Sequence, residues 1–106
     1  MSTLDSVDEA SFDARVLSSE VPVLVDFTAT WCMPCKALAP VLESLARENA
    51  GKVAVVAVDG DAAPMLANRF RVKAYPTVVA FAGGKEVARV VGLTSKEKLL
   101  GLLRSA

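Results

Sequence analysis

The two cysteines of this 106-residue chain, Cys32 and Cys35, lie three positions apart in the hexapeptide Trp-Cys-Met-Pro-Cys-Lys. Two cysteines placed at random in a chain of this length would show that spacing only about 2% of the time. A disulfide across so short a loop stabilises a fold weakly, by roughly 2 kcal/mol against about 3 kcal/mol for a 15-residue loop. The spacing therefore indicates a pair that reacts together rather than a structural bridge.

The residues after the first cysteine predict a helix that would activate it. Apolar residues recur on one helical face from Pro34 to about Asn49, and Gly51 just beyond supplies a stop signal. Cys32 would lie at the helix N-terminus, where unpaired backbone N–H groups and the macrodipole favour a thiolate and lower the thiol pKa. We expect Cys32, on the outer rim, to attack a partner's disulfide, and Cys35, one turn deeper, to resolve the mixed disulfide.

Two other interpretations of the cysteine pair are a structural role and a metal site. Cysteines are often ordinary buried core residues. Zinc usually takes four ligands, whereas this chain offers two cysteines and no histidine, so no metal is expected. The lack of histidine also excludes a Cys-His protease mechanism. Asp59-Gly60-Asp61 is not followed by the spacing of a calcium loop and is interpreted as a turn.

Asp26 is the second residue that could do chemistry, because it places a carboxylic acid in the apolar run from Val21 to Phe27. If its side chain points inward, desolvation raises its pKa. It would then be a proton acceptor for the Cys35 thiol, directly or through water. The alternative is a carboxylate that faces solvent near the end of a strand.

Length, composition and charge limit the class of protein. With 53% hydrophobic and 23% charged residues, residues 1–106 are expected to form one domain with its own core. Twelve basic residues balance twelve acidic ones and no segment concentrates one sign, so neither nucleic acid nor membrane is an expected partner. No secretory leader or membrane span is recognisable. A reducing cytoplasm is expected, where disulfides are usually transient and catalytic.

The first half of the chain predicts two buried strands joined by the long helix. The apolar runs 21–27 and 53–58 are typical of strands covered on both faces, and the helix between them completes a right-handed βαβ unit. A capping box at Ser6 to Glu9 predicts a short helix after it. A further strand is expected near residues 3–7.

The second half predicts a helix from Pro64 to about Phe70 and an antiparallel hairpin over 77–82 and 85–91, joined by a two-glycine turn. A capping box at residues 94–97 opens a last helix. The whole is an α/β fold, a mixed sheet with helices on both faces. Pro76 stands just before a strand, where spacing alone predicts a simple turn, because few X-Pro bonds are cis.

Several of these motifs together make nearly all of the chain resemble a thioredoxin. The landmarks that carry the resemblance are Phe12-Asp13, Val25-Asp26-Phe27, Trp31 to Lys36, Pro40, Pro76-Thr77, Gly84 and Gly92. The resemblance implies the thioredoxin fold, a five-stranded mixed sheet in the order 1-3-2-4-5 flanked by four helices. It also implies dithiol-disulfide exchange with protein substrates, and cis geometry at Pro76 in place of the simple turn.

The same resemblance implies an apolar groove around the sulfurs, in which a substrate segment lies extended. The residues expected to line it are Trp31, Met33, Ala74, Tyr75, Pro76, Val91 and Gly92. Residues Met33, Pro34 and Lys36 are expected to tune the cysteine pair.

Three positions depart from the family pattern. Met33 replaces the glycine usual between the cysteines and is expected to affect redox potential and partner choice. Thr28 stands where the family commonly has a second tryptophan, and Ala57 where it commonly has a lysine near the buried acid. Without that cation, Asp26 is expected to be harder to ionise.

The sequence thus predicts a cytoplasmic protein-disulfide reductase that acts as a monomer and binds no cofactor. A separate enzyme, thioredoxin reductase or a ferredoxin-linked reductase, would recycle it. One alternative is a dedicated disulfide oxidant or isomerase, with a less reducing potential and an oxidising compartment. The other is a non-catalytic binding subunit that uses the apolar groove.

Overall fold

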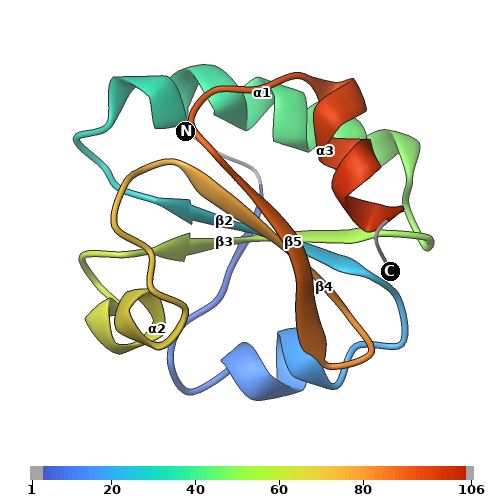
Figure 1. The fold of residues 1–106 in the computed structure, drawn as a ribbon, viewed down its shortest axis with the longest axis horizontal. Coiled ribbons are helices and arrows are strands. Elements are labelled where there is room, and N and C mark those ends of the chain that lie inside the picture. The colour runs from blue at the N-terminus through green and yellow to red at the C-terminus, as the bar shows by residue number, and fades with distance from the viewer. Residues whose placement is uncertain (1–3, 105–106) are drawn as a thin grey trace.

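The computed structural model describes residues 4–104, in which five strands form one mixed sheet in the order β1-β3-β2-β4-β5 (Figure 1). Strand β2 pairs in parallel with β3 and antiparallel with β4, so it lies at the centre. The predicted fold class and strand order are confirmed. In chain order, the elements are β1 (Asp5–Ser6), η1 (Asp13–Leu17), β2 (Val23–Thr28), α1 (Met33–Glu48), β3 (Ala54–Asp59), α2 (Pro64–Arg69), β4 (Thr77–Ala82), β5 (Lys85–Val91) and α3 (Lys96–Leu103).

The helices cover both faces of the sheet, with α1 and α3 on one side and η1 and α2 on the other (Figure 1). The side chains of β2 alternate between these faces, as a strand requires. Val25 and Phe27 belong to the core beneath η1 and α2, whereas Leu24 belongs to the core beneath α1 and α3. By the same alternation, Asp26 points to the α1/α3 face. None of the helices within residues 4–104 is long and apolar enough to cross a membrane.

Helix α1 begins where the cysteine motif predicts. Cys32 precedes it in an extended conformation, with φ −91° and ψ 110°, and Pro34 lies in the first turn, where its missing N–H leaves no partner unsatisfied. The far end is followed by Gly51, whose φ of 83° is the left-handed conformation that glycine adopts readily. The predicted helix, 34–49, differs from the observed one by a single residue at each end.

The predicted capping box at Ser6 to Glu9 is wrong. Asp8 and Ser11 form the reciprocal pair ahead of η1 instead: the Asp8 N–H donates to Ser11 Oγ at 3.1 Å, and the Ser11 N–H donates to Asp8 Oδ1 at 2.9 Å. Ser6 belongs to strand β1, and Glu9 accepts the backbone N–H of Met65 at 2.7 Å, in the first turn of α2. A tertiary contact therefore uses the glutamate that the local motif had assigned to η1.

The C-terminal half follows the prediction closely. Strands β4 and β5 have the predicted bounds, and α3 begins one residue later than the capping box implied, because Ser95, and not Thr94, accepts the N–H of Lys98 at 3.2 Å. At the other end of the chain, the strand expected near residues 3–7 is β1, the pair Asp5–Ser6; Thr3 lies outside the described residues.

Candidate functional site

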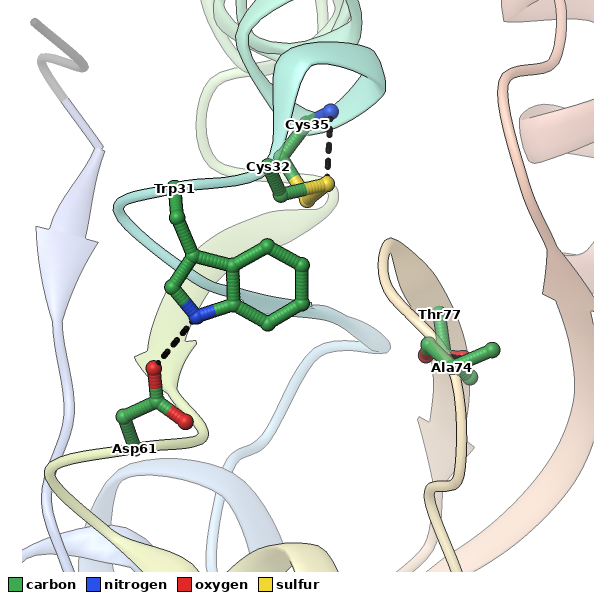
Figure 2. Close-up of a disulfide and its surroundings, with 6 residues drawn as sticks. All are labelled: Trp31, Cys32, Cys35, Asp61, Ala74 and Thr77. Atoms are coloured by element: carbon green, nitrogen blue, oxygen red, sulfur yellow. Dashed lines mark hydrogen bonds between the residues drawn. A yellow bond between two sulfur atoms is a disulfide. The ribbon is translucent and has the colours of Figure 1, made fainter.

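Cys32 and Cys35 are joined by a disulfide at the N-terminus of α1 (Figure 2). The Cys32 sulfur accepts the backbone N–H of Cys35 at 3.2 Å and so caps the helix. An N–H donor and the positive end of the helix dipole at this sulfur both stabilise negative charge. The predicted position of Cys32 at the helix start is confirmed.

The expected difference in exposure between the two cysteines is absent in this disulfide form. Both residues are only 3% exposed, because they cluster with Ala29 and pack against Tyr75. The neighbouring Met33, by contrast, is 71% exposed. Position along the helix therefore distinguishes the two sulfurs, while solvent access does not.

Trp31 extends an exposed apolar surface from the disulfide toward Tyr75. It is 64% exposed, and its ring meets that of Tyr75 edge-on, with centroids 6.0 Å apart. Its indole N–H donates to Asp61 Oδ2 at 2.7 Å (Figure 2). The sequence did not reveal this role of Asp61, because the aspartate lies thirty positions from Trp31 and was interpreted as a turn residue.

The loop before β4 carries Ala74, Tyr75 and Pro76, three of the residues expected to line the groove. The Tyr75–Pro76 peptide bond is cis, as the family resemblance implied, and Pro76 is buried. The Thr77 hydroxyl donates to the Ala74 carbonyl at 2.7 Å and fixes this loop.

The end of β5 lies beside that loop. The Gly92 N–H donates to the Pro76 carbonyl at 2.8 Å, and Val91 pairs with Thr77 across the strands. Val91 is 59% exposed, which adds another apolar side chain to the surface. Tyr75 touches the cysteine cluster, so the structure brings together the loop, the end of β5 and the disulfide.

Gly60, which sequence reasoning treated only as a turn residue, makes room for Tyr75. A Cβ at Gly60 would overlap the Tyr75 hydroxyl and ring. Burial, with the nearby Asp61 and Asp59 carboxylates, raises the pKa of the Tyr75 hydroxyl, so it remains neutral and protonated. The Asp59 side chain closes the turn by accepting the N–H of Asp61 at 2.9 Å, as the turn interpretation predicts.

Asp26 is buried in the centre of the sheet, only 4% exposed, which rules out the solvent-facing alternative. Desolvation raises its pKa from 3.8 to about 7. Within residues 4–104, its Oδ1 atom has no hydrogen-bond partner. The carboxyl is therefore a group that changes protonation state near neutral pH.

A cavity of about 490 Å³ connects Asp26 with the disulfide. Ala57, which departs from the family pattern, is the β3 residue paired with Asp26, and Thr28, a second departure, lies on the wall as well. Small side chains at these positions leave the space open. The cavity is lined by Asp26, Thr28, Ala29, Thr30, Cys35, Lys36, Ala39, Pro40, Glu43, Ala57 and Asp59.

A disulfide that caps the helix following the central strand of a mixed five-stranded sheet, beside exposed apolar side chains, defines a thiol-disulfide oxidoreductase. The thioredoxin family model matches residues 3–105. The chain belongs to the thioredoxin family.

Individual relatives agree with this family. The chain is 51% identical over 94 residues to the bifunctional thioredoxin reductase/thioredoxin of Mycobacterium leprae, a match that covers 89% of this chain and 20% of that protein. It is 50% identical over 94 residues to the thioredoxin of Mycobacterium bovis, covering 89% of this chain and 81% of the relative. The thioredoxin of Synechocystis is 43% identical over 103 residues, covering 97% and 96%.

Proposed function

We propose that this chain is a protein-disulfide reductase of the cytoplasm, in which Cys32 is the attacking thiol and Cys35 the resolving one. The observation that carries the proposal is the sulfur of Cys32 at the N-terminus of α1, where it accepts the Cys35 N–H. In the reduced protein, the same N–H and the helix dipole would stabilise a Cys32 thiolate and lower its pKa.

The reaction proceeds through two exchanges of sulfur. The Cys32 thiolate attacks one sulfur of the substrate disulfide and forms a mixed disulfide with it, while the other substrate sulfur leaves as a thiolate. The Cys35 thiolate then attacks the Cys32 sulfur and displaces the substrate sulfur that was held in the mixed disulfide. The substrate gains two electrons, and the protein is left with the Cys32–Cys35 disulfide seen in the structure.

Asp26 is the proton acceptor for the Cys35 thiol in the second exchange. Both residues line the same cavity, whose volume of about 490 Å³ is large enough to hold water molecules. With a pKa of about 7, the carboxyl is roughly half ionised at neutral pH and is matched to this transfer.

The exposed apolar surface receives the substrate. An extended segment would lie across Trp31, Met33 and Val91 and pair with the backbone at Ala74 and Tyr75, next to Pro76 and Gly92. Met33 and Pro34, together with Lys36 at the cavity, would tune the reactivity of the pair.

A separate reductase would return the disulfide to the dithiol. The name of the Mycobacterium leprae relative joins thioredoxin reductase and thioredoxin in one protein, which supports a thioredoxin reductase over a ferredoxin-linked enzyme as the electron source. A reducing cytoplasm fits a pair that cycles between dithiol and disulfide. Residues 1–106 would act as one domain and as a monomer.

Reduction of insulin disulfides by the wild type, by Cys32→Ser and by Cys35→Ser tests the assignment. Both variants should lose turnover, and only Cys35→Ser should accumulate a mixed disulfide, because it retains the attacking thiol and lacks the resolving one. In the reduced wild type, Cys32 should react with iodoacetamide at neutral pH far faster than Cys35. Equal alkylation of the two thiols, or trapping by Cys32→Ser, would contradict the assigned roles.

Asp26→Asn separates the two exchanges. In single-turnover experiments at pH 7, we expect resolution of the mixed disulfide to slow by about tenfold or more, while the first attack stays nearly unchanged. The wild-type resolution rate should rise as the pH passes through 7, since the carboxylate is the acceptor, and the rate of the variant should lack this step. Matching resolution rates and pH profiles would remove Asp26 from the mechanism.

A further inference from the structure

The cavity between β2, β3 and α1 has the dimensions of a ligand site. Its volume of about 490 Å³ falls within the roughly 300–1,000 Å³ typical of small-molecule pockets. An apolar cavity of about 150 Å³ is already large enough to bind benzene. Ala29, Ala39, Pro40 and Ala57 give the space an apolar wall, and the exposed Thr30 places its mouth at the surface.

Asp26 offers an unused hydrogen-bond acceptor to this space. The residue is 4% exposed, lines the cavity, and carries an Oδ1 atom that lacks a hydrogen-bond partner in the described part of the chain. Buried polar groups are nearly always paired, so a donor from a bound molecule that reaches the Asp26 carboxyl group would be stabilising.

The charged residues of the lining favour a cation. Within residues 4–104, Asp26 on β2 and Asp59 at the end of β3 each contribute a carboxyl group to the lining, against the single ammonium group of Lys36 on α1. Lys36 is exposed, and its flexible stem allows its charge to stay in water. A ligand that enters with a positive head group would meet complementary charge at the buried end of the cavity.

We propose that this cavity binds a small organic cation, a primary ammonium group on an apolar body of about one aromatic ring. The ammonium group donates to Asp26, and the ring packs against the wall formed by Ala39 and Ala57. Binding needs no turnover, so it is measured on the disulfide form and is independent of the proposed roles of the cysteines and of Asp26 in catalysis.

The probe is benzylammonium, titrated into the oxidised, ¹⁵N-labelled protein at pH 8, where Asp26 is mostly ionised. We expect saturable amide shifts at Asp26, Ala39 and Ala57. Benzyl alcohol, which has nearly the same shape without the charge, should bind about tenfold more weakly or worse. Absence of saturable shifts, shifts centred elsewhere, or equal affinity for the alcohol would overturn the proposal.

Variants that fill the cavity from two sides locate the binding. Ala57→Leu on β3 and Ala39→Leu on α1 should each weaken benzylammonium binding by about tenfold or more, because the added side chain occupies the ring position. Ala37→Leu, on the exposed side of the same helix, is the matched control and should bind as the wild type does. Amide spectra verify that each variant is folded, and either filled variant suffices if the other fails to fold. Wild-type affinity in a folded, filled variant would contradict the site.

Asp26→Asn tests the contact with the head group. It should weaken benzylammonium binding by about tenfold and leave the affinity for benzyl alcohol within about twofold, because only the charged contact is lost. Equal losses for both probes would mean that the substitution changed the cavity rather than the ion pair, and would overturn the assignment of Asp26 as the acceptor.

Discussion

The two faces of the sheet are packed by different means. Beneath η1 and α2, aromatic rings interlock: Phe70 lies 5.2 Å from both Phe12 and Phe81 between ring centroids, and 6.3 Å from Phe27. Beneath α1 and α3 the core is mainly leucine and valine, and it gives way, near the disulfide, to the buried Asp26 and the cavity.

The comparison shows how this fold separates stability from chemistry. A buried carboxyl and an open cavity both reduce stability, the first through desolvation and the second through lost packing contacts. Both lie on the face that carries the helix-capping sulfur, where the proposed proton transfer needs them. The aromatic face has no part in that transfer and can be packed for stability alone.

Removing a ring from the aromatic face gives the largest expected effect. Phe81 is 1% exposed and packs against two other rings, so Phe81→Ala should lower the free energy of unfolding by about 3–5 kcal/mol in urea titrations. Reductase activity of the remaining folded protein should be unchanged. Phe81→Leu, a smaller loss, provides a second measurement if the alanine variant does not fold.

The control for that experiment is Met65→Ala, which truncates an exposed side chain on the neighbouring helix α2 and should change stability by less than about 0.5 kcal/mol. If folded Phe81→Leu protein lost reductase activity in proportion to its lost stability, the separation between the two faces would be wrong.

Asp26→Asn, on the α1/α3 face, should raise the free energy of unfolding, whereas Phe81→Ala lowers it. The pKa of the carboxyl is about 7 in the folded protein and 3.8 ordinarily, so its favourable contribution to stability is complete below pH 3.8, declines above it and is lost above about pH 7. Relative to the wild type, the variant should be more stable by up to about 4 kcal/mol at pH 8.5 and nearly equal at pH 4.

Urea titrations of both oxidised proteins at the two pH values measure this difference. A stability gain that is the same at pH 4 and pH 8.5 would show that the gain comes from packing or hydrogen bonding and not from the buried charge.

Patterns confined to neighbouring residues predicted much of this molecule. Strands β4 and β5 were predicted residue for residue, since a two-glycine turn and two apolar runs determine a hairpin locally. Cys32 at the start of α1 also follows from a local pattern, namely a proline in the first helical turn. The apolar strand around Asp26 left both an inward and a solvent-facing side chain open, and the burial of Asp26 in the structure decides for the first.

Features that depend on distant segments were not predictable in this way. Asp8 and Ser11 form the reciprocal pair ahead of η1, while Glu9 contacts the backbone of Met65, fifty-six positions away. The bond from Trp31 to Asp61 and the burial of Cys32 depend on how the loops fold back on the site. The cavity is bounded by three elements, so the small side chains that form it have no common pattern in the sequence.

Gly60→Ala tests how closely the site is packed where β3 ends. The new Cβ would overlap the Tyr75 hydroxyl, so the ring must move, and we expect a loss of about 1–3 kcal/mol in urea titrations. Because Tyr75 packs on the cysteine cluster, the near-ultraviolet circular dichroism of the oxidised protein should change as well. An unchanged spectrum together with unchanged stability would mean that the Tyr75 ring has room to move. The packing around Tyr75 would then be less tight than the structure indicates.

Gly101→Ala makes the same chemical change on the α1/α3 face. It should have the smallest effect on stability, and it should raise stability where Gly60→Ala lowers it. Gly101 lies inside α3, and no atom of residues 4–104 beyond its own helix backbone and its chain neighbours lies within 4 Å of the position of an added Cβ. Alanine restricts the unfolded chain more than glycine does, so stability should rise by about 0.5–1 kcal/mol. Identical losses of stability in Gly60→Ala and Gly101→Ala would show that the added methyl group itself, and not its surroundings, determines the change in the free energy of unfolding. A gain at position 101 beside a loss at position 60 would locate the tight packing around Tyr75.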